Sequence, residues 1–244
     1  MTVLEYDSFT AGTADPAKWQ VLQLPTPDGG LWAYGDPEAV VEARDGTMRV
    51  TVNPFRLKHD TVHMLDDPKH LLVTPEPIPL APGSRTTISV EMACETLDGN
   101  PDDLLDGMIG LVVGDFSTGM IFDWVLSATR AGAIYERLPI PGVTPDGGAF
   151  TYVVQSPFVA QNAPGEFRRY EVTLDPAART GEWRVDGRPF YRTAAIPVEV
   201  ASVTLGLIVC TLLPPDPERG SISVHGQGAR GSWRHLCVAT DPRE

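Results

Sequence analysis

Two acidic residues, Asp123 and Glu136, lie in a segment that has the pattern of a β-hairpin. Residues 119–138 form two stretches in which apolar and polar side chains alternate, joined by a turn of a few residues. A turn centred on Thr129 and Arg130 would place Asp123 directly opposite Glu136, where Cβ atoms are about 4.5–5.5 Å apart. The spacing therefore predicts a close pair of carboxyl groups on one face of a sheet.

Such a pair suits acid–base catalysis. Asp123 has aliphatic neighbours on its face of the strand, so burial would raise the pKa of its carboxyl, and a nearby carboxylate would raise it further. One acid could then donate a proton while the other, ionised, accepts one. Arg137 or Arg130 would stabilise developing negative charge. Carboxyl groups about 5–5.5 Å apart would also suit retaining glycoside hydrolysis.

A structural alternative stays open for the same residues. In it, Asp123 pairs with Arg130 or Arg137, and Glu136 faces solvent. A shift of one residue in the pairing would also separate the two acids, because successive side chains of a strand point to opposite faces. The catalytic hypothesis thus depends on the register of this hairpin.

Further side chains could bind and orient a substrate in the same groove. Two aromatic candidates follow a glycine-containing loop, two flank the acids, and two polar candidates lie at a strand end and in the loop after it. These residues are Trp32, Tyr34, Trp124, Tyr135, Asn53 and His63. Each aromatic could instead belong to the core, and Asn53 could simply cap the turn at Pro54.

No metal site or cofactor is predicted. His59, His63 and His70 alternate with acidic residues, but prolines on both sides of this stretch favour a loop over the helix that would align them. The acidic loop at 98–106 does not follow the spacing of a calcium loop, although a structural calcium stays open. Nucleophile-elbow, phosphate-loop and dinucleotide motifs are absent from the sequence. Chemistry without a cofactor, or binding alone, remains.

The elements that must position these residues are strands. The chain has 23 glycines and 23 prolines, which separate about a dozen short alternating segments rich in β-branched and aromatic residues. Almost no helical periodicity is visible. The sequence therefore predicts an all-β sandwich or barrel, with residues 1–244 as a single domain.

Composition excludes some partners. The net charge of −13 argues against nucleic acid or an anionic membrane as a partner. No apolar run reaches the length of a membrane span, and the N-terminus lacks the pattern of a signal peptide. The three cysteines are far apart and form no metal-type pair. We expect a cytoplasmic protein with a small-molecule ligand. Its oligomeric state is open.

Several segments resemble the concanavalin A-like lectin and glucanase superfamily. These are YDSFTAGTADPAKW at 6–19, DGTMRVTV at 45–52, FRRYEVTLDP at 167–176 with WRVDGRP at 183–189, and VTLGLI at 203–208. The resemblance implies a jelly-roll β-sandwich of two large antiparallel sheets, with ligands in a concave groove. The sequence is also similar to actinobacterial cytoplasmic members associated with natural-product pathways.

One departure from that superfamily concerns function. Laminarinase-like members carry a Glu-x-Asp-x-x-Glu strand that is absent here, and the nearest counterpart, FDWVLS at 122–127, keeps one acid. Their catalytic residues are therefore not transferred to this chain. The leading hypothesis is a cofactor-independent enzyme for cyclisation, isomerisation or hydrolysis of a mostly apolar natural-product intermediate. The alternatives are a carbohydrate-binding module and an atypical glycoside hydrolase.

Overall fold

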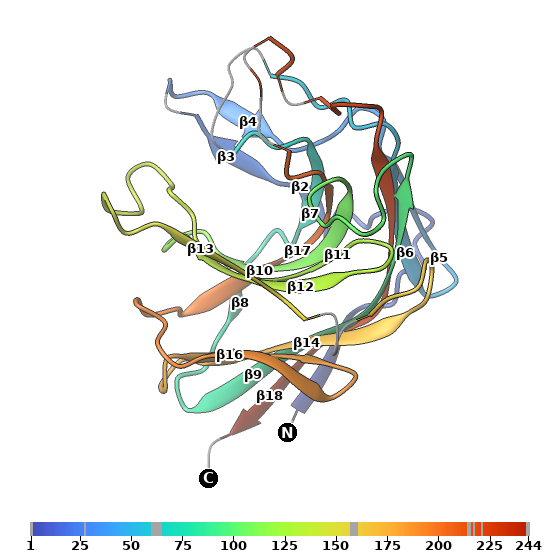
Figure 1. The fold of residues 1–244 in the computed structure, drawn as a ribbon. Helices are drawn as coiled ribbons and strands as arrows, with labels where there is room; N and C mark the ends of the chain where they lie inside the picture. The colour runs from blue at the N-terminus through green and yellow to red at the C-terminus, as the bar shows by residue number, and fades with distance from the viewer. Residues whose placement is uncertain are drawn as a thin grey trace.

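Two eight-stranded antiparallel sheets pack face to face (Figure 1). The computed structural model describes residues 2–26, 28–59, 65–156, 161–213, 216, 218–220 and 222–242, in which all regular structure is β-strand. The predicted fold class, an all-β jelly-roll sandwich, is confirmed. The described part of the chain has no helix long and apolar enough to cross a membrane.

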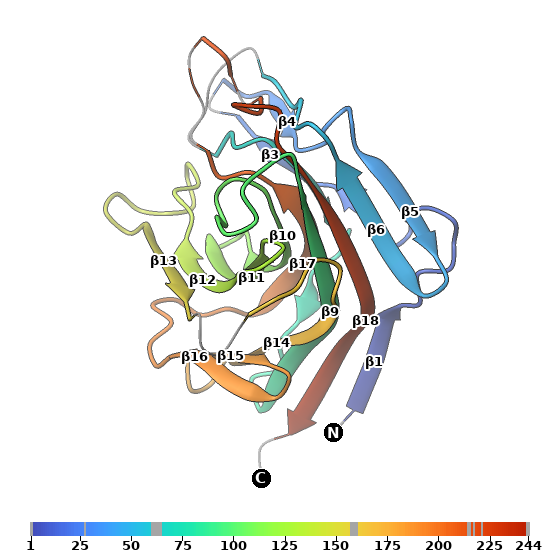
Figure 2. The same ribbon diagram turned by 45° about the vertical axis from the view of Figure 1, so that its right-hand side comes forward.

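Sheet I is built around two long central strands that lie side by side (Figure 2). In spatial order its strands are β16 (Arg188–Thr193), β15 (Thr180–Val185), β14 (Arg168–Asp175), β9 (Ser84–Leu97), β18 (Gly228–Pro242), β6 (Thr47–Val52) and β5 (Val40–Arg44), with β1 (Thr2–Asp7) also paired to β18.

Sheet II carries the predicted hairpin. In spatial order its strands are β13 (Phe150–Gln155), β12 (Ala131–Arg137), β11 (Met120–Leu126), β10 (Met108–Asp115), β17 (Ser202–Cys210), β7 (Lys69–Val73) and β2 (Gln20–Val21), with β8 (Ile78–Pro79) also paired to β17. A separate hairpin of β3 (Gln23–Pro25) and β4 (Leu31–Ala33) stands beyond the β2 edge (Figure 1).

The main core fills the space between the sheets. Alternate residues of β11 face it, among them Phe122 and Trp124, which are completely buried. Three tryptophans also link the sheets by donating their indole N–H to backbone carbonyls of the opposite sheet. The donor–acceptor pairs are Trp124 to Glu171 at 2.9 Å, Trp183 to Asp123 at 3.1 Å and Trp233 to Gly110 at 3.2 Å. These bonds satisfy indole N–H groups that would otherwise be costly to bury.

The β11–β12 hairpin forms, but its register differs from the prediction. Asp123 pairs with Ile134, and Glu136 pairs with Ile121, so the acids are diagonal neighbours and not directly opposed. The turn closes one residue earlier than expected because Ser127 N–H donates to Arg130 C=O and the Ser127 hydroxyl accepts the Arg130 N–H. A turn displaced by one residue moves the pairing by two, so both acids keep the same face.

Candidate functional site

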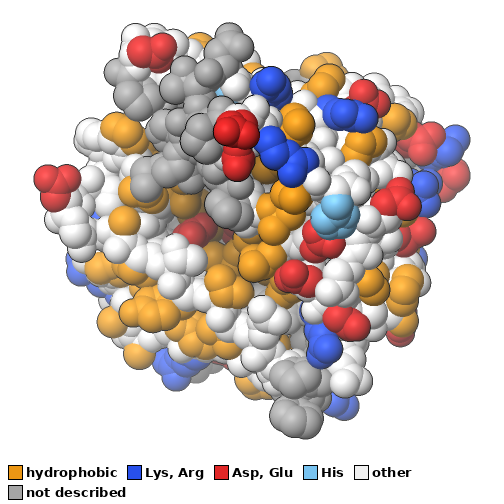
Figure 3. Space-filling model, turned by 45° about the horizontal axis from the view of Figure 1, so that its top comes forward, with side chains coloured by type: hydrophobic (Ala, Val, Ile, Leu, Met, Phe, Trp, Pro, Cys, Tyr) orange, Lys and Arg blue, Asp and Glu red, His pale blue; other side chains and the backbone are white. Residues whose placement is uncertain are grey.

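The face of sheet II that points away from sheet I encloses a cavity of about 360 Å³. Hydrophobic side chains gather around this hollow (Figure 3). Residues of β10, β11, β12, β17 and β7 form its floor, and residues of β3 and of the connection after β12 form parts of its wall. The aliphatic lining comprises Leu22, Leu24, Leu65, Leu71, Val112, Ile121, Val125, Ile134, Leu138, Val153, Ile208 and Leu212. Such a volume and lining suit a small organic ligand.

Asp123 lies in the floor of this cavity and is 9% exposed. The ladder between β10 and β11 is interrupted at Val112 and Val113, opposite Asp123. At this gap the Val113 N–H donates to Asp123 Oδ1 at 3.0 Å. Burial and the nearby Glu136 raise the pKa of the Asp123 carboxyl well above its ordinary value, although the bond from Val113 opposes the shift. Asp123 is therefore held in place and favours its protonated form.

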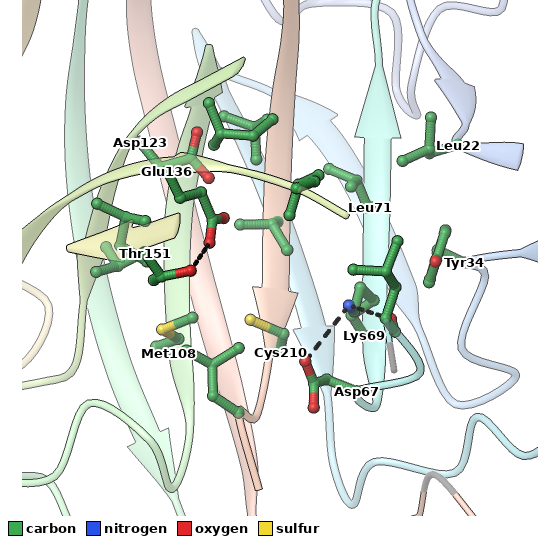
Figure 4. Close-up of a pocket in the computed structure, with 18 of the residues that line it drawn as sticks. Leu22, Tyr34, Asp67, Lys69, Leu71, Met108, Asp123, Glu136, Thr151 and Cys210 are labelled. Atoms are coloured by element: carbon green, nitrogen blue, oxygen red, sulfur yellow. Dashed lines mark hydrogen bonds and ion pairs between the residues drawn. The ribbon is translucent and has the colours of Figure 1, made fainter. Parts of the chain in front are cut away.

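Glu136 comes from β12 and points into the same cavity (Figure 4). Its Oε2 accepts a hydrogen bond from Thr151 Oγ1 of β13 at 3.0 Å. Burial and, to a lesser extent, the carboxylate of Asp67 raise the pKa of Glu136, whereas the Thr151 hydroxyl and the positive charge of Lys69 lower it. The two acids thus share a cavity but differ in surroundings, because a hydroxyl and a cation favour the ionised form of Glu136.

A second polar group lies across the cavity from the acids (Figure 4). Lys69, the first residue of β7, places its ammonium 3.9 Å from Asp67 Oδ2 and 4.8 Å from the centre of the Tyr34 ring. Its Nζ donates to the Leu65 carbonyl at 3.0 Å. Burial raises the pKa of Asp67, and Lys69 lowers it. The Tyr34 hydroxyl also has a raised pKa because it is buried near acids, so it remains neutral.

Only some of the predicted site residues reach the cavity. Asp123, Glu136 and Tyr34 line it. Trp124 and Tyr135 instead belong to the core between the sheets, because they alternate with the acids along their strands. The predicted role of these two aromatics in holding a substrate is therefore corrected.

The two predicted arginines are also placed elsewhere. Arg130 lies in the hairpin turn, where its Nε is 3.5 Å from Asp102 Oδ1. Arg137 pairs with the core residue Met120 and therefore belongs to the opposite face, and its Nε donates to the Thr118 carbonyl. Neither guanidinium is positioned to stabilise charge in the cavity.

The other three predicted binding residues lie in different parts of the chain. Trp32 is buried against Tyr34 and borders a small recess beside the cavity. Asn53 lies just beyond the end of β6 in sheet I and donates to Asp98 Oδ2 at 3.3 Å, away from the cavity. His63 lies outside the described residues.

Sequence reasoning missed Lys69, Asp67 and Thr151. The available signal was slight: one lysine precedes a histidine and three aliphatic residues, and one threonine occupies an alternating strand. None of them stands near the acids of the β11–β12 hairpin in a pattern that indicates chemistry. Within the described ranges no group of three or more His, Cys, Asp or Glu side chains could hold a metal ion.

The fold and the cavity define the class of the protein as a concanavalin A-like β-sandwich with a ligand-sized hollow on its second sheet. Residues 6–242 match the model of a family of unknown function, DUF6081, and the chain belongs to that family. Among curated proteins, none matches the sequence.

Solved structures with the same fold include glycoside hydrolases. An endo-1,3-β-glucanase from Streptomyces sioyaensis has a TM-score of 0.62 and 12% identity, over 100% of this chain and 96% of that one. A β-1,3-1,4-glucanase (lichenase) derived from a mouse hindgut metagenome has a TM-score of 0.58 and 14% identity, over 100% of both chains. A sialidase matches with a TM-score of 0.54 and 11% identity, and 96% of this chain covers only 18% of it. At such identities the likeness concerns the fold.

Proposed function

We propose that this protein binds a mostly apolar small organic molecule in the cavity and catalyses acid–base chemistry on it without a cofactor. The observation that carries the proposal is the pair Asp123 and Glu136, two carboxyl groups with raised pKa values in one aliphatic cavity. Cyclisation, isomerisation or hydrolysis of a natural-product intermediate would fit such a site. Raised carboxyl pKa values in a cleft favour an active site over a structural role.

The surroundings assign different roles to the two acids. The pKa of Asp123 is the more strongly raised, mainly because this carboxyl is buried, so Asp123 is the proton donor. Glu136 has a hydroxyl donor and a cation that favour its ionised form, so it is the base. Because the groups interact, they titrate as a pair, and the singly protonated pair is the active form.

A glycoside hydrolase is the second candidate. It is supported by the glucanase neighbours and by the position of two acids on one sheet face. Against it, the aromatic rings that would contact a sugar face away: Trp124 and Tyr135 are core residues, and the described lining is mainly aliphatic. The aliphatic lining favours the apolar ligand.

Two assays separate these candidates. Laminarin and lichenan are incubated with the protein, and reducing ends are measured; their release would support the hydrolase. Binding of the apolar dye N-phenylnaphthylamine is followed by fluorescence, and we expect one site that is blocked by Ile208→Trp, since Ile208 lines the cavity.

Catalysis is tested with β-tetralone, an apolar ketone whose α-protons exchange in deuterium oxide. The native protein should accelerate this exchange, and Asp123→Asn and Glu136→Gln should each reduce the acceleration at least about tenfold. The same rate in all three proteins would leave a binding function without acid–base catalysis.

A further inference from the structure

The Lys69 ammonium lines the cavity but makes few hydrogen bonds to the described residues. The Lys69 side chain is 12% exposed and lines the hollow together with the acids. An ammonium group has three N–H donors. Within the described part of the chain, one of them bonds the Leu65 carbonyl, and Asp67 Oδ2, at 3.9 Å, is beyond hydrogen-bond distance. Among the described residues, no further oxygen acceptor lies within hydrogen-bond distance of the remaining donors.

The neighbours of Lys69 hold it in place without neutralising it completely. The Tyr34 ring lies below the ammonium at 4.8 Å, and this contact orients the cation without occupying its N–H groups. Asp67 supplies one carboxylate at the outer limit of an ion pair. A buried cation in this setting gains most from a second, closer oxygen acceptor.

We propose that Lys69 binds an acidic oxygen of the ligand, so that the cavity selects amphipathic molecules with an apolar body and one carboxylate, enolate or phenolate oxygen. This inference rests on the proposed function and specifies its substrate class. The oxygen lies at the Lys69 side, and the apolar body lies over the aliphatic floor. Asp123 and Glu136 then meet the part of the ligand that is distant from this oxygen.

The charges of the cavity agree with such a ligand. Lys69 is the one cation in the described lining, and the acids on the far side favour their protonated forms more than surface acids do. A ligand oriented the other way would bring its negative oxygen against Glu136, the acid to which we assign the ionised form. The charges on the two sides of the cavity therefore determine the orientation of the ligand as well as its affinity.

The test uses two dyes that differ in one group. Anilinonaphthalene sulfonate carries an anionic group, and N-phenylnaphthylamine has the same aromatic body without it. In Lys69→Met the stem is kept and the charge is removed. We expect the affinity for the sulfonate dye to fall about tenfold or more and that for the neutral dye to change less than about twofold.

Control variants separate local from general effects. Lys58 is exposed, so Lys58→Met removes the same charge from the protein without touching the cavity, and it should leave both dyes unaffected. Lys69→Arg should retain part of the preference for the sulfonate dye. Equal affinity changes for both dyes in Lys69→Met, or none in either, would overturn the inference.

A measurement on the native chain avoids dependence on a variant that fails to fold. The sequence has three lysines, Lys18, Lys58 and Lys69. Carbon-13 labelling at Cε thus gives three signals, and the sulfonate dye should move the Lys69 signal much more than the neutral dye does. Shifts that are the same for both dyes would contradict the role of Lys69. If the neutral dye does not enter the native cavity at all, the proposed function fails first, and this inference falls with it.

Discussion

The two faces of sheet II are made by the same strands and have opposite properties. On the side of sheet I, Phe122 and Trp124 of β11 are completely buried among other large side chains, and indole N–H groups bond carbonyls across the interface. On the other side, Ile121 and Asp123 border a hollow of about 360 Å³. Adjacent residues of one strand thus serve either packing or binding.

The difference follows from what covers each face. A second sheet lies over the first face, so every side chain meets others and voids are costly. Of the residues that the structure describes, those of the β3–β4 hairpin and of the connection after β12 cover the margins of the second face (Figure 1). Polar groups can remain there because the hollow admits a ligand or water. Asp123 and Glu136 therefore lie on the face of sheet II whose packing contributes less to the stability of the fold.

The largest expected effect contrasts the two faces directly. Trp124→Ala should lower the free energy of unfolding by about 3–5 kcal/mol, because it empties space in a close-packed core. Ile208→Ala, on the hollow face, should cost about 1 kcal/mol, since this side chain is only partly buried and borders existing space. Chemical denaturation measures both values. Equal costs would show that the cavity face is packed as tightly as the core.

A smaller effect tests the indole bonds between the sheets. Trp183→Phe keeps an aromatic ring but removes the indole bond to the Asp123 carbonyl, which should cost about 1 kcal/mol. Trp233→Phe should behave alike, because its indole bonds the Gly110 carbonyl in the same way. Thermal and denaturant unfolding of both variants check the prediction. Native-like stability in both would mean that these bonds add nothing to ring packing.

The buried carboxyl of Asp123 should lower the free energy of unfolding as the pH rises. Because the pKa of Asp123 is raised in the folded state, the folded protein binds this proton more tightly than the unfolded chain does. Stability contributed by the group is complete below the unfolded pKa of about 4 and is lost as the pH rises through the folded pKa. Asp123→Asn should therefore be more stable than the native protein at high pH, and the difference should vanish near pH 4. A difference independent of pH would contradict burial of the ionisable group.

The smallest effect concerns the bond that distinguishes the two acids. Thr151→Val removes the hydroxyl that donates to Glu136 Oε2, so the pKa of Glu136 should rise further. Thr151 is exposed, and the free energy of unfolding should change by less than about 0.5 kcal/mol. Titration of the Glu136 carboxyl by NMR checks the shift. An unchanged titration would remove the reason for assigning Glu136 as the base.

The sequence could predict most of the fold but only part of the candidate site. Alternation in residues 119–138 indicated the hairpin and the shared face of Asp123 and Glu136, because the period of a strand is two. It did not indicate the register, which the bonds between Ser127 and Arg130 decide. The same alternation, applied to Trp124 and Tyr135, would have assigned both rings to the core.

By itself, then, the sequence determined which side chains share a face, since this depends only on the backbone period. Tertiary structure alone decided that Lys69 and Glu136 line the same cavity. Lys69 pairs with Cys210, which pairs with Met108 of β10. Glu136 pairs with Ile121, which pairs with Gly114 of the same strand. Six residues, from 108 to 114, span about 20 Å along an extended strand. Sheets twist with a fixed hand, so the placement of such distant residues around one hollow depends on the whole sheet. No local sequence pattern records that placement, because three strands, β11, β10 and β17, lie between the strands of the two residues.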